Sequence, residues 1–171
     1  MKLLIIFIYL IITNFSYASE KPDIKNLVLI KNPKTYENVM FKNINQKDVD
    51  LDDFKGKLII FNFWATWCAP CKEEMPSLDR LQSNSNFKNI KIFPINIGQE
   101  GVSKSESFFK ELNIKNLEIY FDAPITLAKK FALRGVPTTI LFNKEGKEFA
   151  RIIGSIDFND KEFINWLKLY N

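Results

Sequence analysis

Two cysteines, Cys68 and Cys71, carry the clearest chemistry in this sequence, and they are the only cysteines among its 171 residues. Two thiols separated by two residues can close a small disulfide ring, which exchanges with other disulfides through a mixed disulfide. A disulfide that closes so short a loop adds little stability compared with one that closes a long loop. The placement of the pair therefore indicates a redox role.

The residues around the pair predict which sulfur attacks. An apolar run at 58–63 is typical of a strand buried on both faces, and a helix is expected to begin directly after it, at the cysteines. Pro70 suits the first turn of a helix because its missing N–H would have no helical partner there. Free N–H groups and the helix dipole favour a thiolate at Cys68. Cys71, one turn deeper on the apolar face, is then the resolving cysteine.

Metal binding is the main alternative for such a pair, because two cysteines at this spacing are also half of a zinc site. A structural zinc ion normally takes four Cys or His ligands, and this chain has no histidine. We therefore expect no metal site. Two thiolates also suit Cu(I), so a Cu(I)-carrying binding protein stays open as an alternative. The absence of histidine argues against a Cys–His hydrolase.

The N-terminus has the pattern of a signal for export. Lys2 precedes an apolar run at 3–12, and small residues stand at Ser16 and Ala18, which is a secretory signal pattern. The run is shorter than the roughly 20 residues that span a bilayer, so we expect cleavage after residue 18, with a retained anchor as the alternative. Export places the chain in the periplasm, where disulfides form and persist.

The remaining sequence predicts one α/β domain with a mixed sheet. Residues 19–37, interrupted by Pro22 and Pro33, are expected to form an extended arm, and 38–171 the domain. Pro94 predicts a bulge or an edge position in its strand. The expected elements are strands at 39–41 and 49–51, then the strand and helix around the cysteines, then strand 90–97, helix 103–112, strand 117–121, helix 125–133, strands 138–142 and 148–153, and helix 157–169.

Two motifs give the chain a family resemblance. The run FNFWATWCAPC at 61–71 resembles the active-site strand and turn of thioredoxin-fold proteins, and GVPTT at 135–139 resembles their loop with a cis-proline. The likeness covers about residues 38–170 and is greatest to the exported TlpA/ResA branch of thiol–disulfide oxidoreductases. It implies a three-layer thioredoxin-like fold with a central mixed sheet, an N-terminal strand pair and an insertion between the CxxC helix and the cis-proline loop.

The resemblance also assigns substrate-binding residues. It implies that Pro137 is cis and lies beside the disulfide, and that the backbone of Val136 bonds an extended substrate segment. Taken alone, the sequence favours a trans proline that opens an edge strand, so the cis assignment rests on the resemblance. Trp67, Ala69 and Pro70 are expected to line the surface that meets the partner protein.

Three polar positions are candidates for tuning the thiols. Glu74 matches a glutamate that tunes the thiols in the ResA-like branch, although it also fits a surface glutamate paired with lysine. A nearby carboxylate disfavours a thiolate, which suits a reductant. Asn62 stands where thioredoxins carry a buried aspartate. Gln99 stands where the branch carries a second acid, which puts a mechanism with two carboxylates in doubt.

The resemblance implies a periplasmic reductase that takes electrons from a membrane thiol donor. Its clients would be cysteine-containing proteins in the assembly of respiratory cytochromes and cytochrome oxidase. A disulfide-forming oxidase is the alternative within the same chemistry, and it would need a strongly stabilised Cys68 thiolate. The net charge of +4 is spread over many lysines and predicts no nucleic-acid site. We expect a monomer with no small-molecule cofactor besides the redox-active disulfide.

Overall fold

One mixed sheet organises the described residues, which are 22–24 and 26–171; the expected signal segment 1–18 lies outside them. Its strand order is β1-β8-β7-β4-β5-β6-β2-β3. Strand β5 runs parallel to β4 and β6, and the other neighbours are antiparallel. The strands are β1 Leu27–Lys34, β2 Met40–Asn43, β3 Asp48–Asp50, β4 Leu58–Trp64, β5 Ile90–Asn96, β6 Tyr120–Phe121, β7 Thr138–Phe142 and β8 Glu148–Ile153.

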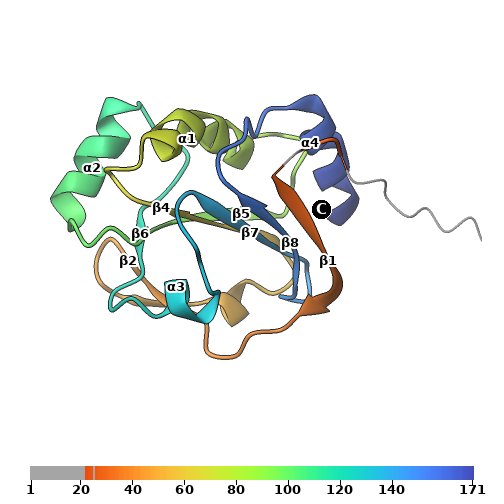
Figure 1. The fold of residues 1–171 in the computed structure, drawn as a ribbon, viewed down its shortest axis with the longest axis horizontal. Helices are drawn as coiled ribbons and strands as arrows, with labels where there is room; N and C mark the ends of the chain where they lie inside the picture. The colour runs from red at the N-terminus through yellow and green to blue at the C-terminus, as the bar shows by residue number, and fades with distance from the viewer. Residues whose placement is uncertain (1–21, 25) are drawn as a thin grey trace, which may run out of the picture.

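Helices cover both faces of this sheet and make three layers (Figure 1). Helices α1 (Ala69–Gln82), α2 (Val102–Glu111) and α4 (Lys161–Leu167) lie on one face. The short helix α3 (Leu127–Lys130) lies on the other, as does the 3-10 helix at Leu51–Phe54. The predicted fold class, a thioredoxin-like three-layer arrangement with a central mixed sheet, is confirmed.

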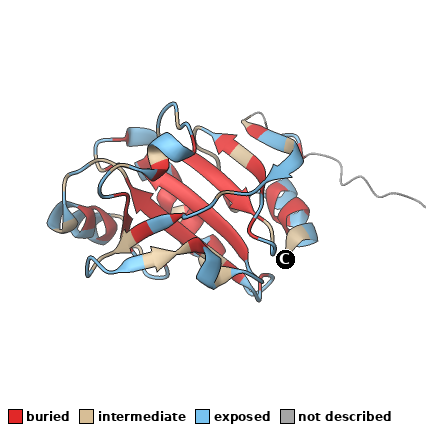
Figure 2. Ribbon diagram, turned by 90° about the horizontal axis from the view of Figure 1, so that it is seen from below, coloured by how far each residue is buried: buried red, intermediate tan, exposed pale blue. Residues whose placement is uncertain are grey.

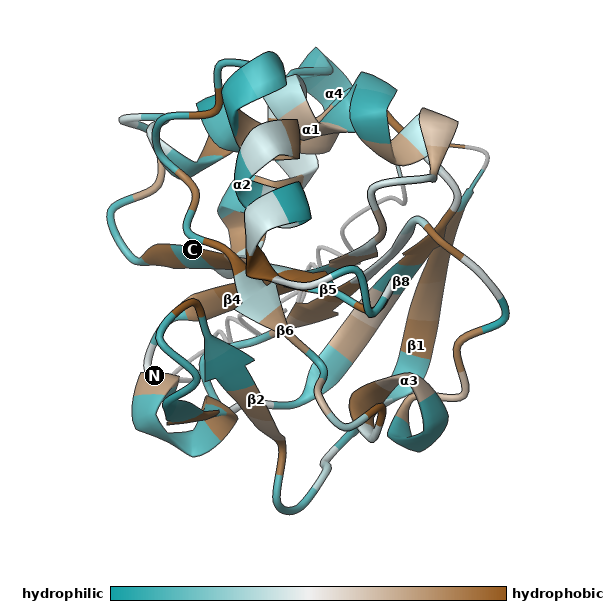
Figure 3. Ribbon diagram, turned by 90° about the vertical axis from the view of Figure 1, so that its left-hand side faces the viewer, coloured by the Kyte–Doolittle hydropathy of each residue, from teal (hydrophilic) through white to brown (hydrophobic). Residues whose placement is uncertain are grey.

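Strand β4 forms the centre of the core. All seven of its residues are buried, because β5 and β7 flank it and helices cover both faces (Figure 2). Its side chains alternate between two clusters. Ile60 and Trp64 pack on the α1 side, whereas Phe61 and Phe63 pack with Phe131 on the α3 side. Figure 3 shows the hydrophobic segments concentrated in the central strands.

The N-terminal part of the chain differs from the expectation. The predicted strand pair is present as the antiparallel β2 and β3, but the expected arm contains β1, an edge strand that pairs with β8. Tyr36 then donates a hydrogen bond of 2.6 Å to the buried carboxylate of Glu148, which Arg151 also binds. Residues 27–37 therefore belong to the domain, and the boundary predicted at 38 was too late.

Several elements are shorter than the sequence pattern indicated. The helix expected at 125–133 is confined to α3, because Ala132 has a left-handed φ of 50°. The strand expected at 117–121 is limited to β6, and the final helix continues beyond α4 only as a 3-10 turn, Lys168–Tyr170. Pro94 lies at neither the expected bulge nor an edge strand, because β5 is flanked by β4 and β6 and Pro94 is in register with Asn62 of β4. Its missing N–H is tolerated because only Ile95 and Asn96 of β5 pair with β6.

No helix among residues 22–24 and 26–171 is long and apolar enough to cross a membrane.

Candidate active site

The cysteine pair lies where strand β4 passes into helix α1. Cys68 is the residue that caps α1, and it forms a disulfide with Cys71 in the first turn. The backbone N–H of Cys71 donates to the Sγ atom of Cys68 at 3.2 Å. Cys71 is fully buried, whereas Cys68 is 5% exposed. A helix N-terminus and an N–H donor both favour negative charge on the outer sulfur, which is the arrangement expected for an attacking Cys68.

The residues next to the pair present an apolar surface to solvent. Trp67 is 69% exposed, an unusual state for so large an aromatic side chain. Ala69 and Pro70 are also exposed. All three predicted contact residues are therefore accessible on the turn that carries Cys68.

The second predicted motif lies at the same end of the sheet. Strand β7 runs antiparallel to β4 with Thr138 opposite Phe63, which brings the loop before β7 to the end of β4 that leads into the cysteines. The Val136–Pro137 bond is cis, so that prediction is confirmed. The sequence did not predict a second cis bond, Ala123–Pro124.

The loop is fixed, but the backbone groups of one residue in it are unused. Thr138 donates its hydroxyl to the carbonyl of Gly135 at 2.8 Å, and the N–H of Gly154 donates to the carbonyl of Pro137 at 2.9 Å. Within the described part of the chain, the backbone N–H and C=O of Val136 have no hydrogen-bond partner. These groups are therefore available to pair with an extended segment of another chain.

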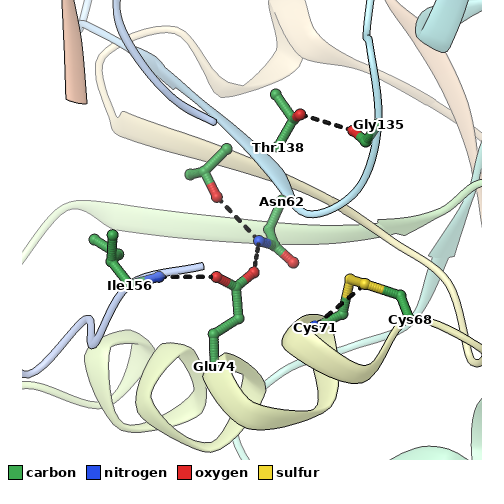
Figure 4. The surroundings of a disulfide bond; sticks show 8 residues. Asn62, Cys68, Cys71, Glu74, Gly135, Thr138 and Ile156 are labelled. Atoms are coloured by element: carbon green, nitrogen blue, oxygen red, sulfur yellow. Dashed lines mark hydrogen bonds between the residues drawn. A yellow bond between two sulfur atoms is a disulfide. The ribbon is translucent and has the colours of Figure 1, made fainter. Parts of the chain in front are cut away.

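Glu74 is buried beneath the pair, one helical turn after Cys71 (Figure 4). Its side chain is 2% exposed, and it accepts hydrogen bonds from Nδ2 of Asn62 at 2.7 Å and from the N–H of Ile156 at 3.3 Å. Burial raises the pKa of the Glu74 carboxyl to about 7, and the two hydrogen bonds oppose that rise. The alternative interpretation as a surface glutamate paired with lysine is wrong.

Asn62 joins this carboxyl to the sheet. It is fully buried in β4, and its Nδ2 also donates to the hydroxyl of Thr139 at 3.0 Å. Its Oδ1 is buried and has no partner among the described residues. A buried polar atom left unpaired costs about 1–3 kcal/mol, so this oxygen requires an explanation.

A hollow connects Glu74 to the outside. It has a volume of about 440 Å³ and lies between α1 and the segment after β8. Its lining residues are Glu73, Glu74, Ser77, Arg80, Ser155, Ile156 and Asp157. The carboxyl can therefore exchange protons with solvent on a side that does not require passage over Trp67.

Gln99 stands at the position where the ResA-like branch carries a second acidic residue. Gln99 is exposed, with a left-handed φ of 59°. Its neighbour Glu100 accepts a hydrogen bond of 2.7 Å from the hydroxyl of Thr66, two residues before Cys68. Sequence reasoning did not single out this carboxylate, because its link to the active-site turn depends on how β5 and β4 are aligned.

The described residues contain no group of three or more His, Cys, Asp or Glu side chains that could hold a metal ion.

Known proteins are similar to this chain in sequence and in fold. The model of the AhpC/TSA family matches residues 34–147, more than half of the chain. The chain belongs to this family. ResA of Bacillus thuringiensis subsp. konkukian, named a thiol–disulfide oxidoreductase, is 30% identical over 121 residues, which cover 71% of this chain and 69% of that protein. ResA of Bacillus subtilis is 29% identical over 119 residues, covering 70% of this chain and 65% of that protein.

Solved structures support the fold. StoA of Bacillus subtilis superposes with a TM-score of 0.62 at 23% identity, covering 85% of this chain and 98% of that one. The predicted likeness to the thioredoxin fold and to the ResA branch is therefore confirmed. Family membership and the Cys68–Cys71 disulfide together support thiol–disulfide oxidoreduction as the activity of this chain.

Proposed function

We propose that the chain is a reductase of protein disulfides that works outside the cytosol through Cys68 and Cys71. The observation that carries this proposal is the buried carboxyl of Glu74, one turn from Cys71 and with its pKa raised to about 7 by burial. A carboxylate close to the pair disfavours thiolate formation. A strong oxidant of the DsbA type needs the opposite, because its reduced form is stabilised.

The reaction begins with the reduced pair. The thiolate of Cys68 attacks one sulfur of a client disulfide, the client S–S bond breaks, and the released client sulfur takes up a proton. The sulfur of Cys71 then loses its proton and attacks Cys68, so that the Cys68–Cys71 bond forms and the second client sulfur leaves as a thiol. Two electrons have passed from the pair to the client. A thiol donor returns two electrons to close the cycle.

The client binds over the exposed turn. Trp67, Ala69 and Pro70 supply apolar contact around Cys68, and the unused peptide groups of Val136 pair with an extended segment that carries the client cysteine. The pairing of β7 with β4 places Val136 near the end of β4 that leads into the cysteines. Cys71 and Glu74 stay buried below the contact surface, and Glu74 borders the hollow between α1 and the segment after β8.

Location and clients follow from the sequence pattern and the family resemblance. A signal segment at residues 1–18 supports export to the periplasm, where client disulfides form. The donor is then a membrane thiol protein, and the clients are cysteine-containing proteins of respiratory cytochrome and cytochrome oxidase assembly. The protein acts as a monomer without a bound cofactor.

Trapping tests the assignment of the two cysteines. The Cys71→Ser variant should accumulate mixed disulfides between Cys68 and client proteins when it is expressed in its native cell envelope, because the resolving sulfur is absent. The matched Cys68→Ser variant should trap almost none. Non-reducing gels and identification of the linked proteins provide the readout. Equal trapping by both variants, or by neither, would contradict the proposed roles.

A further inference from the structure

Asn62 lies on the same face of the sheet as the redox pair. Side chains alternate along β4, and Ile60 and Trp64, two residues to either side of Asn62, belong to the cluster that contains Cys71 and Met75. Asn62 therefore points from the sheet toward helix α1, where Cys71 is also fully buried. The polar amide lies in an otherwise apolar layer below the disulfide.

Hydrogen bonds fix the orientation of this amide. A side-chain amide has two donor hydrogens and one acceptor oxygen. Both donors of Asn62 are used, by Oε1 of Glu74 at 2.7 Å and by the hydroxyl of Thr139 at 3.0 Å. With Glu74 ionised, the reverse orientation would set the amide oxygen against a carboxylate oxygen, and neither atom could donate a hydrogen bond. The oxygen consequently points away from Glu74, and Figure 4 shows it directed to the side on which the disulfide lies.

In the disulfide form this oxygen has no donor. Oδ1 of Asn62 is buried and unpaired among the described residues, and neither sulfur of the Cys68–Cys71 bond carries a hydrogen. Reduction changes this, because the pair gains two electrons and two protons and Cys71 becomes a thiol. A thiol is a weak hydrogen-bond donor, so reduction creates a donor on Cys71, in the same buried layer as the unused acceptor of Asn62.

We propose that Oδ1 of Asn62 accepts a hydrogen bond from the Cys71 thiol in the reduced protein, so that Asn62 is a positioning residue for the resolving cysteine. A hydrogen bond to the neutral form disfavours the thiolate. Cys71 therefore stays protonated. Cys68, whose Sγ accepts a hydrogen bond from the backbone N–H of Cys71, is the cysteine that ionises. The proton of Cys71 leaves only when its sulfur attacks the mixed disulfide, and it passes to the departing client sulfur.

A small set of charged side chains lies near Asn62. Glu74 bonds the same amide, and Glu73 and Arg80 of α1 and Asp157 of the segment after β8 line the hollow beside it. The proposal rests on the redox cycle of the cysteine pair but not on its direction. If the test of Asn62 failed, the reductase proposal would still stand. If the pair had an oxidising potential, the proposed role of Asn62 would still stand.

The test uses the full chain with Cys68→Ala, in which Cys71 is the one remaining thiol. Ultraviolet absorbance of the thiolate against pH gives the pKa of Cys71. Adding Asn62→Leu should lower this pKa, because the acceptor is lost and the side chain keeps its size. Asn62→Asp keeps an acceptor oxygen and should not lower it. Thr139→Val, which removes only the other partner of the amide, should leave the pKa unchanged.

A second measurement does not depend on any change at position 62. The infrared S–H stretching band of Cys71 in the Cys68→Ala protein should lie at the lower frequency of a hydrogen-bonded thiol. A band at the position of a free thiol would overturn the proposal. An unchanged or raised pKa in the Asn62→Leu protein, or equal shifts in the leucine and aspartate variants, would do so too.

Discussion

The chemistry of the site depends on a buried carboxyl that is linked to the sheet by a side-chain amide. Glu74 has lost almost all contact with solvent and retains only the hydrogen bonds from Asn62 and Ile156. Two such bonds do not restore the hydration of an ionised carboxylate, so the neutral acid is favoured up to about neutral pH, where its pKa lies at about 7. The group can therefore change its charge within the working range of the enzyme.

The stability of the fold should show this titration. The pKa of Glu74 is about 7 in the folded chain against a model value of 4.5, so the folded state binds more protons between these values. The free energy of unfolding should thus fall as pH rises through this window, by up to about 3 kcal/mol at roughly 1.4 kcal/mol per unit. The Glu74→Gln variant should lose this part of the pH dependence. Urea unfolding at pH 4.5 and pH 8 measures it.

The control is Glu73→Gln, which alters the neighbouring exposed glutamate on the same helix. This variant should retain the pH dependence of the unmodified protein. If Glu74→Gln and Glu73→Gln proteins show the same difference in stability between the two pH values, the carboxyl of Glu74 does not have a raised pKa.

At the scale of elements, helix α1 is held against the segment that leads into β6. The carboxylate of Asp79 accepts hydrogen bonds from the backbone N–H groups of Lys115, Asn116 and Leu117 at 3.1, 2.7 and 3.1 Å, and from Nδ2 of Asn116 at 2.9 Å. These bonds satisfy three consecutive backbone N–H groups just before β6. They also fix the helix whose first turn carries the cysteines.

Asp79→Ala should therefore be strongly destabilising. Hydrogen bonds to charged groups contribute about 1.5–3 kcal/mol each, and the freed N–H groups regain only part of their hydration. We expect a loss of about 3–5 kcal/mol in the free energy of unfolding, measured by urea denaturation. Glu106→Ala, an exposed change on α2, should stay within about 0.5 kcal/mol. A loss below about 1 kcal/mol for Asp79→Ala would show that these bonds do not hold the helix.

Local patterns predicted the elements nearest the site and failed for those that depend on distant partners. The apolar run of β4 and the helical spacing after Cys71 are local signals, and both elements formed as expected. Strand β1 was missed although it begins with the apolar run at 27–30, because Pro22 and Pro33 on either side indicated an extended arm. Its partner β8 lies near the other end of the sequence.

The same limit applies within the site. The spacing of Cys68 and Cys71 identified the redox pair, and the family resemblance identified Pro137. The bond between Asn62 and Glu74 joins a strand to a helix. This bond lowers the pKa of the Glu74 carboxyl, whereas the burial of the carboxyl between the two elements raises it. Neither residue type nor spacing specifies that contact, since it exists only after α1 has packed on the sheet.

At the scale of the whole molecule, the sheet is buried on both faces (Figure 2), and both cysteines belong to the buried cluster on its α1 face. The loop with the cysteines follows the carboxyl end of β4, which is where sites commonly lie in α/β folds. The protein stays folded in both redox forms. The difference in stability between the disulfide form and the dithiol form is therefore linked to the reduction potential of the pair. In a reductase, the disulfide form should be the more stable of the two folded states.

Denaturation with and without reductant tests that link. The oxidised protein should unfold at a higher urea concentration than the reduced protein, because a reducing pair is one whose disulfide is favoured by the fold. The double variant Cys68→Ala/Cys71→Ala should be insensitive to reductant. A reduced form more stable than the oxidised form would be the pattern of a strong oxidant.

The reduction potential of the Cys68–Cys71 pair tests the central claim most directly. Equilibration of the full chain in thiol–disulfide buffers at pH 7, followed by quantification of free thiols, gives this value. A reductase with a buried carboxyl beneath its cysteines should have a potential near the thioredoxin end of the range, roughly −270 mV. A value near the DsbA end, roughly −120 mV, would contradict the proposed direction of electron flow.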